Sequence, residues 1–576
     1  MLIAIAQLNY TIGDIQGNAT KILQVIGDQK NKVDLIVFTE LALTGYYPQD
    51  LIFSNPVWQA EEAALAEICK ATENSRAAVV IGCVTKNPFA GKPFQNSIKV
   101  FTSGAESFCY SKKLLPTYNI FEEARHFSPG QQQGVWLFKG YKLGFLICED
   151  GWGQAEHHNL YASHPVNELK GQGLDLIISV NASPSNLGKQ TQRRQVFKDV
   201  ALTCDAPVIY SNQVGGNDEI VFDGASFAVN KYGEMVGMMA SFEEAIGILE
   251  YDKEEGEGPR KGQFTKAEGF GHSEISIEPS LMVNQAMLGL RDYVDKLGFP
   301  GVVVGSSGGI DSAVTLALAA RALGPERVKA ITMPSKYSSA GSVDDSVKLC
   351  QNLGIELFTR PIKDDFDVAV REFEVAFGEV PSGLTQENIQ ARVRGRVLME
   401  YSNHTGYLVL STGNKSEMAV GYATLYGDMN GGLNLLGDMY KCDVYAVARW
   451  FNNAYPEMQI PIEIIDKAPS AELAPGQADT DSLPLYEILD AILRIYIESD
   501  LLSEEERNLY LETLKATSDA TIKRVCRMID HAEFKRRQAP PIIRMQRRSF
   551  GIGRHLPIVA KYPDINKLSD LSLMLR

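Results

Sequence analysis

Residues 302–321 read VVVGSSGGIDSAVTLALAAR, and this stretch predicts the fold of the C-terminal half of the chain. An apolar run leads into a turn rich in glycine and serine, and an alanine-rich helical segment follows. A strand, a glycine-rich turn and a helix in this order place free backbone N–H groups and the positive end of the helix dipole together, which suits an anion such as phosphate. The simpler alternative is an ordinary Gly-Ser turn that caps a helix.

The turn differs from a kinase-type phosphate loop, which has a lysine before its final Ser or Thr. Asp311 occupies that position, where a carboxylate is better suited to Mg²⁺ than to direct contact with phosphate. The motif resembles the SGGxDS loop of the ATP pyrophosphatase (PP-loop) enzymes, which cleave ATP between its α and β phosphates and adenylate a substrate. That resemblance implies ATP binding by Gly305, Ser306, Ser307, Gly308, Gly309, Ile310, Asp311 and Ser312.

The C-terminal half alternates predicted strands with predicted helices, which is typical of a doubly wound parallel α/β (Rossmann-like) fold. The strands are expected at 302–304, 328–332 and 407–411, and the helices at 313–322, 342–353 and 386–402. The segment 252–273 is polar, rich in glycine and poor in aliphatic residues. We therefore predict a linker at 252–273 that separates an N-terminal domain, 1–251, from a C-terminal domain, 274–576.

The composition of the chain excludes several classes of protein. The 576 residues carry a net charge of −15, which disfavours nucleic acid as a partner. No apolar run approaches the ~18 residues of a membrane helix, so no membrane partner is expected. The eight cysteines form no CxxC pair and no cluster with histidine, which argues against disulfides and zinc. The first residues are typical of a strand rather than a signal peptide, and we expect a cytoplasmic protein.

Three apolar runs in the N-terminal half end abruptly in polar residues. They are 34–40, 141–149 and 175–183, and they end near Glu40, Cys148 and Ser183. Short continuous apolar runs predict strands that are buried on both faces. Ligands gather at the carboxyl ends of such strands, so the three ends predict one shared site.

Cys148 is a candidate nucleophile within this shared site. A cysteine at the end of a buried strand is often only part of the core. As a nucleophile it needs a base, which Glu40 could provide, and a positive group near the developing oxyanion. Lys112 or Lys113 could be that positive group, and only one of them can reach the thiol because neighbouring residues on a strand point to opposite faces.

Three sequence words, FTELALTGY, YSKKLLPTYNIFEE and LICEDGW, together resemble the motifs of the nitrilase (carbon–nitrogen hydrolase) superfamily. The resemblance implies an αββα sandwich and a triad of Glu40 as general base, Lys112 as oxyanion stabiliser and Cys148 as nucleophile. The family's lysine lies three residues before the leucine of its Leu-Pro pair, which is Leu115 in this chain, and this selects Lys112. The resemblance further implies that Glu123 supports the triad and that the glutamine contacts are Tyr118, Ser183 and Lys189.

Further candidates for the second site follow the PP-loop. Thr412 and Glu417 lie beyond a predicted strand, where Glu417 could share Mg²⁺ with Asp311. Arg392 and Arg396 share one face of the helix predicted at 386–402, and they either bind phosphate or form a solvated basic face. A basic stretch without acids, 535–548, indicates either an anionic ligand or a subunit contact.

These segments, in this order, resemble the NAD⁺ synthetases. The resemblance implies that ATP is also contacted by Thr412, Lys441 and Ser470, and that magnesium is held by Asp311 and Glu417. The contacts that it implies for deamido-NAD⁺ are Asn388, Arg392, Glu417 and Lys535.

A nitrilase-type amidase joined to such a synthetase resembles the glutamine-dependent NAD⁺ synthetases. This implies an ATP- and Mg²⁺-dependent ligase that hydrolyses glutamine and amidates deamido-NAD⁺ through an adenylate, with ammonia passing inside the protein. We also expect a homo-oligomer. Two rivals are a PP-loop amidotransferase that activates another carboxylate and a nucleotide-binding sensor without catalysis. Intact Glu40, Lys112, Cys148 and Asp311 argue against the sensor.

Overall fold

The computed structural model of the chain consists of two compact units, Met1–Ser276 and Ile277–Arg576, which are described separately. The structure describes all residues except 153–159, 254–262, 272–276, 471, 475–478 and 562–576. Within the described residues, no helix has the length and apolar character needed to cross a membrane.

The first unit contains two large β-sheets. The seven-stranded sheet has the order β15-β14-β1-β2-β3-β4-β5, and the six-stranded sheet has the order β13-β12-β9-β8-β7-β6. The strands of the first sheet are β1 (Leu2–Gln7), β2 (Leu35–Val37), β3 (Ala78–Lys86), β4 (Phe94–Thr102), β5 (Ala105–Ser111), β14 (Ala245–Asp252) and β15 (Gln263–Glu268). Those of the second are β6 (Val135–Phe138), β7 (Tyr141–Ile147), β8 (Leu176–Asn181), β9 (Val208–Asn212), β12 (Phe227–Val229) and β13 (Met235–Met238).

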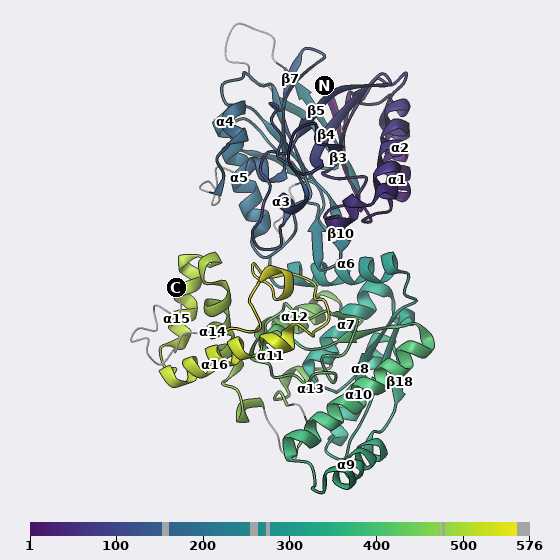
Figure 1. Ribbon diagram of the computed structural model, residues 1–576, viewed down its shortest axis with the longest axis vertical. Coiled ribbons are helices and arrows are strands. Elements are labelled where there is room, and N and C mark those ends of the chain that lie inside the picture. The colour runs from purple at the N-terminus through teal and green to yellow at the C-terminus, as the bar shows by residue number, and fades with distance from the viewer. Residues whose placement is uncertain (153–159, 254–262, 272–276, 471, 475–478, 562–576) are drawn as a thin grey trace. The chain divides into compact units, whose positions relative to one another are not determined.

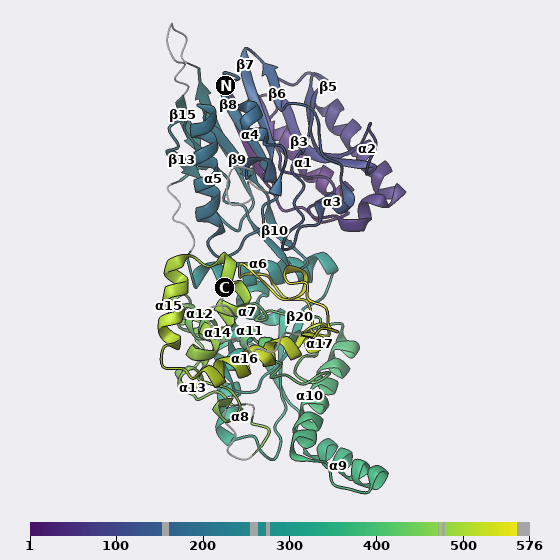
Figure 2. The same cartoon turned by 60° about the vertical axis from the view of Figure 1, so that its left-hand side comes forward.

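The two sheets face each other and form an αββα sandwich, as predicted. One core cluster joins Val37 and Val100 of the first sheet to Phe145 and Ile178 of the second. The outer face of the first sheet is covered by α1 (Ile15–Gln29) and α2 (Asn55–Ala71). The outer face of the second sheet is covered by α4 (Pro165–Leu169) and α5 (Lys189–Cys204). Figures 1 and 2 show these helix pairs on opposite sides of the sheets.

The predicted shared site changes in one respect, because its three strands belong to two sheets rather than one. β2 lies in the seven-stranded sheet, whereas β7 and β8 are parallel neighbours in the six-stranded sheet. The apolar runs nevertheless form strands buried on both faces, because one face meets the opposing sheet and the other meets helices.

The segment predicted to be a linker, 252–273, is partly a strand. Residues 263–268 form β15, which pairs antiparallel with β14 and makes the edge of the seven-stranded sheet. The exposed and charged character of β15 explains the misleading composition, since an edge strand has little core to cover. Residues 254–262 and 272–273 of this segment lie outside the described residues.

The second unit has the predicted doubly wound parallel fold. Its sheet has the order β18-β17-β16-β19-β20, and all neighbouring strands are parallel. The strands are β16 (Val302–Gly305), β17 (Val328–Thr332), β18 (Glu356–Thr359), β19 (Leu408–Ser411) and β20 (Leu433–Asn434). The chain order reverses between β16 and β19, and a crevice for ligands forms at such a switch point.

Helices cover both faces of this sheet. One face contacts α7 (Ile310–Leu323) and α8 (Ala340–Leu353), and the other packs against α10 (Gly383–Thr405). α10 buries Val393 and Val397 against Val303 of β16. The other helices of the unit are α6 (Ser280–Leu297), α9 (Lys363–Phe377), α11 (Lys415–Val420), α12 (Lys441–Ala454), α13 (Ile462–Asp466), α14 (Tyr486–Glu498), α15 (Glu504–Leu514), α16 (Asp519–His531) and α17 (Glu533–Arg536).

The basic stretch 535–548 is paired within the unit, which neither sequence-based alternative anticipated. Arg536 and Arg537 bond to Glu533, Arg547 bonds to Glu506 through two hydrogen bonds, and Arg548 bonds to Asp500 in the same way. Lys535, discussed below, donates to backbone carbonyls. These acids, apart from Glu533, are distant in sequence, so the stretch has no local sign of its partners.

Candidate active sites

Cys148 lies where β7 ends and a short 3₁₀ turn, Cys148–Gly151, begins. Its backbone has a φ of 44°, a left-handed conformation that is uncommon for a residue with a side chain. The side chain is buried. Burial raises the pKa of the Cys148 thiol well above its usual value, the nearby Glu40 raises it further, and Lys112 opposes both effects. A thiol whose pKa is raised needs a base to become a nucleophile.

Glu40, Lys112 and Glu123 form one buried network beside Cys148. Lys112 Nζ donates to Glu40 Oε1 (2.8 Å) and to Glu123 Oε1 (2.7 Å), and all three side chains are fully buried. Asn96 Nδ2 also donates to Glu40 Oε1 (2.7 Å). The other oxygen of Glu40 accepts from the backbone N–H of Ala182 (2.8 Å), which joins the end of β8 to this site. These contacts hold the carboxylate of Glu40 in an orientation suited to a general base, with the ammonium of Lys112 next to it.

The structure separates the two adjacent lysines. Lys113 Nζ donates to Glu168 (2.6 Å), on α4, instead of reaching Glu40. Asp150 fixes this geometry, since its carboxylate accepts from the backbone N–H groups of Lys113 and Leu114 and, on its other oxygen, of Ile147. The segment that contains Lys112 is thereby tied to the turn that contains Cys148.

The three predicted glutamine contacts all lie next to this network. Tyr118 donates to both oxygens of Glu149, the residue after Cys148 (3.0 Å each). Ser183 follows Ala182, and its hydroxyl accepts from the buried Arg193 (3.1 Å). The ammonium of Lys189 lies 3.6 Å from the centre of the Trp152 ring. Tyr118 and Lys189 thus contact the turn that begins at Cys148 and the residue after it, and Ser183 follows Ala182, whose N–H bonds to Glu40.

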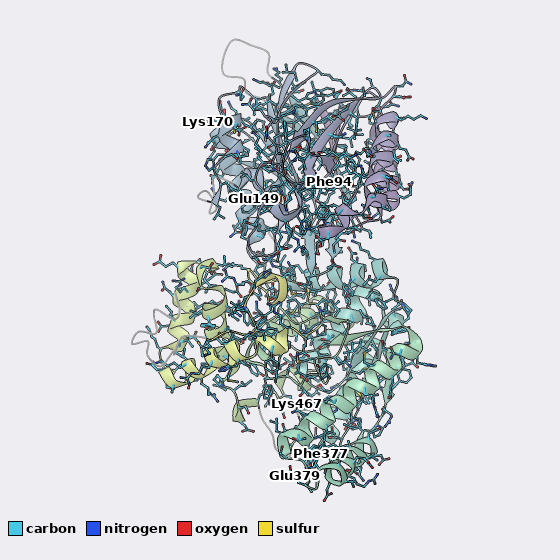
Figure 3. All side chains as sticks on the ribbon, viewed as in Figure 1. Phe94, Glu149, Lys170, Phe377, Glu379 and Lys467 are labelled. Atoms are coloured by element: carbon cyan, nitrogen blue, oxygen red, sulfur yellow. The ribbon has the colours of Figure 1, made fainter. Side chains whose placement is uncertain are left out.

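Several neighbours of the network were not predicted. Glu149, labelled in Figure 3, is buried and also accepts a hydrogen bond from Tyr161 (2.9 Å), so this acid meets the hydroxyl groups of two tyrosines. Asn96 contacts Glu40 from β4, next to the edge strand β5 of the seven-stranded sheet. Glu149 had an available signal, because it directly follows Cys148, whereas Asn96 lies in a strand with no distinctive motif.

The PP-loop leaves β16 and enters α7, as its sequence predicts. Gly308 has a φ of 76°, and a Cβ atom there would lie 2.3 Å from the carbonyl oxygen of Ser342 in α8. A side chain at this position would therefore be both strained and obstructed. Ser307 Oγ lies 3.1 Å from Ser312 Oγ and accepts from the backbone N–H of Gly309 (3.2 Å), so hydroxyl groups hold the loop open.

The loop lines a cavity of about 290 Å³ at the switch point of the sheet. The predicted ATP residues that line this cavity are Gly305, Ser306, Ser307, Gly309, Ile310, Asp311, Ser312, Thr412, Lys441 and Ser470. Gly308 does not line it, which agrees with its role in the backbone turn. The cavity thus brings together residues from β16, β19, α12 and the 467–473 segment.

Asp311 and Glu417 share one ammonium group. Lys441 Nζ donates to Asp311 Oδ2 (2.6 Å) and to Glu417 Oε1 (3.1 Å), and Asn414 Nδ2 donates to Asp311 Oδ1 (2.9 Å). Burial raises the pKa of Glu417 to about 7, although Lys441 opposes that rise. Because both carboxylates reach the same cation, their oxygens could also reach a shared divalent ion, and oxygen donors are those that Mg²⁺ prefers.

The residues predicted to contact deamido-NAD⁺ meet around a different feature, the loop at 421–425. Asn388 accepts from Thr424 Oγ1 (2.8 Å), Arg392 donates to the carbonyl of Leu425 (3.2 Å), and Lys535 donates to the carbonyls of Gly421 and Ala423 (2.8 Å each). These three side chains do not line the cavity, whereas Glu417 does. Thr424 also lines it, so the loop connects the two groups of residues.

Arg394 is a cavity residue that the sequence reasoning did not select. It lies between Arg392 and Arg396 on α10, lines the cavity and donates to the carbonyl of Met333 (3.2 Å). Burial lowers the pKa of its guanidinium to about 10, with Glu472 opposing this effect. Arg396, by contrast, pairs with Asp365 and Glu400 at the surface, which favours the solvated alternative for that residue.

Comparison with known proteins supports the same division of the chain. Residues 2–259 match the family model of carbon-nitrogen hydrolases, and residues 282–539 match that of NAD synthases. The chain therefore combines a carbon–nitrogen hydrolase region with an NAD synthase region. It is 39% identical to a glutamine-dependent NAD(+) synthetase of Synechocystis over 97% of this chain and 99% of the relative. It is 38% identical to that of Thermotoga maritima over 98% and 99%. The chain belongs to the family of glutamine-dependent NAD(+) synthetases.

Solved structures give the same result across the full length. A glutamine-dependent NAD⁺ synthetase from Acinetobacter baumannii, in complex with ADP, matches with a TM-score of 0.74 and 35% identity, covering 97% of this chain and 98% of that one. A glutamine-dependent NAD(+) synthetase from Cytophaga hutchinsonii has a TM-score of 0.77 over 100% and 99%, and at 19% identity it supports the fold alone.

Proposed function

We propose that this protein is an ATP-dependent ligase that hydrolyses glutamine in its first unit and amidates deamido-NAD⁺ to NAD⁺ in its second. The observation that carries the proposal is the pairing of two chemically distinct sites in one chain. The first unit holds a buried cysteine beside a carboxylate–lysine network, and the second holds a PP-loop cavity with a shared acidic pair. Relatives of the family match both units end to end.

In the first unit, Glu40 accepts the proton of the Cys148 thiol as the sulfur attacks the side-chain amide of glutamine. Lys112 faces the negative charge that develops on the carbonyl oxygen. The proton on Glu40 then passes to the amide nitrogen, and the C–N bond breaks to release ammonia and leave a thioester. Water, activated by Glu40, then releases glutamate. Glu123 holds Lys112 from its other side, and burial raises the pKa of Glu123 to about 7 against the opposing effect of Lys112. Tyr118, Ser183 and Lys189 position the substrate.

In the second unit, the PP-loop holds the phosphates of ATP with its backbone N–H groups and the hydroxyls of Ser307 and Ser312. The nicotinate carboxylate of deamido-NAD⁺ attacks the α-phosphate, pyrophosphate leaves, and ammonia displaces AMP from the adenylate. Asp311 and Glu417 would hold Mg²⁺, which neutralises charge on the departing pyrophosphate. Thr412, Lys441 and Ser470 contact ATP, and the buried guanidinium of Arg394 adds a positive charge to the same cavity.

The loop at 421–425 forms the boundary between nucleotide and dinucleotide sites in this proposal. Asn388, Arg392 and Lys535 surround it, and together with Glu417 they contact deamido-NAD⁺. Arginine suits this task because its planar group pairs with phosphate through two hydrogen bonds. The backbone carbonyls that Arg392 and Lys535 now contact, and the Thr424 hydroxyl bonded to Asn388, would exchange for groups of the ligand.

The cysteines and the basic stretch bear on the compartment and the oligomeric state of the protein. All eight cysteines are free thiols, which supports a reducing compartment such as the cytoplasm. The expected homo-oligomer gains no support from the basic stretch 535–548, because Arg536, Arg537, Arg547 and Arg548 pair with acids inside the unit. Sedimentation velocity on the full chain is the direct measure of its oligomeric state.

The function is tested by NAD⁺ formation from deamido-NAD⁺, ATP and Mg²⁺ with glutamine or with ammonium. We expect product with both donors, AMP and pyrophosphate in equal amounts to NAD⁺, and no product without ATP. Product with ammonium but not with glutamine would support the synthetase function and would exclude glutamine as the amide substrate. No product with either donor would favour a PP-loop ligase for another carboxylate, which a screen of carboxylates by pyrophosphate release would identify.

A further inference from the structure

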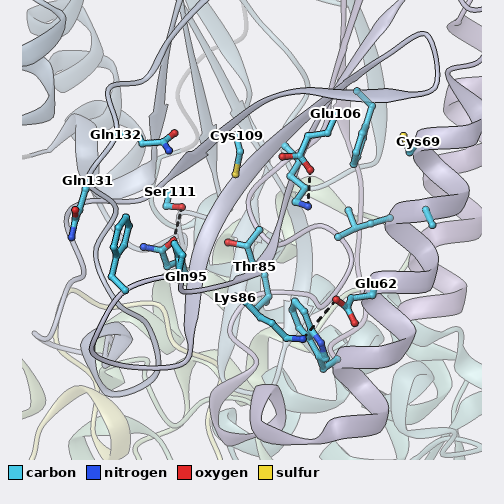
Figure 4. Close-up of a pocket in the computed structure, with 18 residues that line it drawn as sticks. Glu62, Cys69, Thr85, Lys86, Gln95, Glu106, Cys109, Ser111, Gln131 and Gln132 are labelled. Carbon is cyan, nitrogen blue, oxygen red and sulfur yellow. Dashed lines mark hydrogen bonds and ion pairs between the residues drawn. The ribbon is translucent and has the colours of Figure 1, made fainter.

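The first unit has a cavity of about 580 Å³ on the outer face of its seven-stranded sheet (Figure 4). One wall is α2, which contributes Trp58 and Glu62, and the floor is formed by β3, β4 and β5. None of the residues that line this cavity belongs to the Cys148 network. Its size falls within the usual range for sites that bind small molecules.

The floor of this cavity is the reverse side of the strands that hold the Cys148 network. Gln95 and Ser111 line the cavity and bond to each other (3.1 Å), whereas the next residues, Asn96 and Lys112, donate to Glu40. Successive residues of an extended chain point to opposite faces, so the two sites share the start of β4 and the end of β5 with the residue that follows it. A molecule that shifts this floor would change the position of Glu40's partners.

One end of the cavity carries loosely held opposite charges. Lys86 Nζ and Glu62 are 3.9 Å apart, both side chains are more than half exposed (66% and 53%), and Lys86 lies over the Trp58 ring. A second pair, Lys99 and Glu106, is closer at 2.8 Å. Two cations and two anions balance in the lining, which disfavours a polyanion such as a nucleotide. The Lys86–Glu62 pair suits a zwitterion, whose carboxylate and ammonium would each gain an opposite charge.

The other end of the cavity is lined by groups that can both donate and accept hydrogen bonds. Gln131 and Gln132 lie on the side opposite Lys86 and Glu62 (Figure 4), with Gln95 between. A primary amide has two N–H donors and a carbonyl acceptor, and it is complementary to other primary amides. One end of the cavity is therefore complementary to a zwitterion, and the other end is complementary to a primary amide.

We propose that this cavity binds a free α-amino acid with a side-chain amide, and that its occupancy changes the glutaminase rate through β4 and β5. Lys86 receives the α-carboxylate, Glu62 receives the α-ammonium, and the glutamine side chains receive the amide. The binding part goes beyond the proposed function, whereas the effect on rate rests on it.

The binding part is tested by equilibrium dialysis of labelled L-glutamine against the full chain carrying Cys148→Ala, which cannot turn the amide over. We expect two molecules bound per chain, falling to one when Lys86→Met or Glu62→Gln is added. The control is Lys266→Met, which removes a lysine of similar exposure (55%) from another surface ion pair, with Glu268, and should leave the number at two. A fall from one bound glutamine per chain to none when Lys86→Met is added would support binding in this cavity. It would also show that glutamine does not bind at the Cys148 site. An unchanged number in both cavity variants would overturn the proposal.

The effect on rate is tested with Cys148 intact. Wild-type protein should give a glutaminase rate that departs from a simple hyperbola as glutamine rises, since the second site fills as well. Lys86→Met should restore a hyperbola and change KM about fivefold, the lower range of typical coupling between sites. Identical curves for wild type, Lys86→Met and Lys266→Met would contradict coupling between the two faces.

Discussion

The environment of Cys148 explains why the nucleophile needs Glu40, Lys112 and Glu123 beside it. Burial alone would lower the pKa of Lys112, but Glu123 and Glu40 raise it well above its usual value, so Lys112 remains charged. Burial also keeps the thiol of Cys148 protonated. A charged lysine and a neutral thiol favour a mechanism in which Glu40 removes the proton only as the sulfur attacks.

Substitution of the two adjacent lysines should have unequal effects. Lys112→Met removes the ammonium between two buried carboxylates, so we expect the glutaminase rate to fall by roughly 100-fold or more. Lys113→Met removes only the contact with Glu168 and should stay within a few-fold of wild type. Glutaminase assays on both variants, with circular dichroism as the check on folding, measure this difference. Equal losses, or a loss only at Lys113, would show that the assignment is wrong.

At the scale of residues, the sequence identified the groups that interrupt apolar runs and missed those that depend on distant partners. Glu40 and Cys148 each end a buried run, which makes a polar residue conspicuous. Asn96 and Arg394 have no such local contrast, and their importance depends on what faces them in space. The stretch 535–548 was predicted to meet an anionic ligand or another subunit, because the partners of Arg547 and Arg548, Glu506 and Asp500, lie 41 and 48 residues away in the chain.

At the scale of elements, the turn between β16 and α7 depends on Gly308. Gly308→Ala would place a methyl group against the Ser342 carbonyl in a left-handed backbone conformation, so the loop must shift. We expect synthesis from either nitrogen donor to require about tenfold more ATP, or more, because the loop's N–H groups lose their alignment. The KM for ATP, with ammonium as donor, measures this.

A matched glycine provides the control for that substitution. Gly354 ends α8 with a φ of 68°, and the nearest atom to an added Cβ would be 3.7 Å away. Gly354→Ala should therefore lower stability by about 1 kcal/mol and leave the KM for ATP unchanged. An unchanged KM in Gly308→Ala would show that the turn geometry is not needed for ATP.

The contact between α15 and the C-terminal segment should depend on pH. Two hydrogen bonds from Arg547 contribute to lowering the pKa of Glu506 to about 2, although burial opposes this. Because the pKa of this carboxyl is lower in the folded state, its stabilising effect is complete above pH ~4.5 and is lost as the pH falls toward ~2. Glu506→Gln should cost about 1 kcal/mol at pH 7, since the pair is partly exposed, and less at pH 3.5.

Thermal unfolding of wild type and variant at the two pH values measures that difference. Glutamine can replace glutamate in the capping box with Ser503, so only the charge is lost. Glu512→Gln on the same helix removes an exposed pair with Lys515 and should change little at either pH. A Glu506→Gln penalty that is the same at both pH values would contradict the assigned role of the Arg547 pair.

The sequence predicted which segments form strands better than it predicted which strands lie in the same sheet. The runs at 141–149 and 175–183 became β7 and β8, and the order of strands around the PP-loop placed its cavity at the switch point. Local patterns cannot show which sheet a strand joins, so β2 was grouped with β7 and β8 although it lies in the opposite sheet. An exposed edge strand such as β15 has the same composition as a linker, and pairing with β14 is its only distinction.

At the scale of the whole molecule, each unit contains one complete set of reactive groups. The Cys148 network lies within Met1–Ser276, and the PP-loop cavity lies within Ile277–Arg576. Relatives match nearly all of the chain, so the pairing of these units is a property of the family. Ammonia is the one reactant that both sites have in common in the proposed reaction, and supplying it from solution should bypass the first unit.

The most direct test of two linked sites is NAD⁺ synthesis by Cys148→Ala and Asp311→Asn, each supplied with glutamine or ammonium. We expect Cys148→Ala to lose synthesis from glutamine and to keep the wild-type rate from ammonium, since only the first nucleophile is removed. Asp311→Asn should lose synthesis from both donors. A Cys148→Ala variant that is inactive with ammonium, or an Asp311→Asn variant that is active with it, would contradict the assignment of separate roles to the two units.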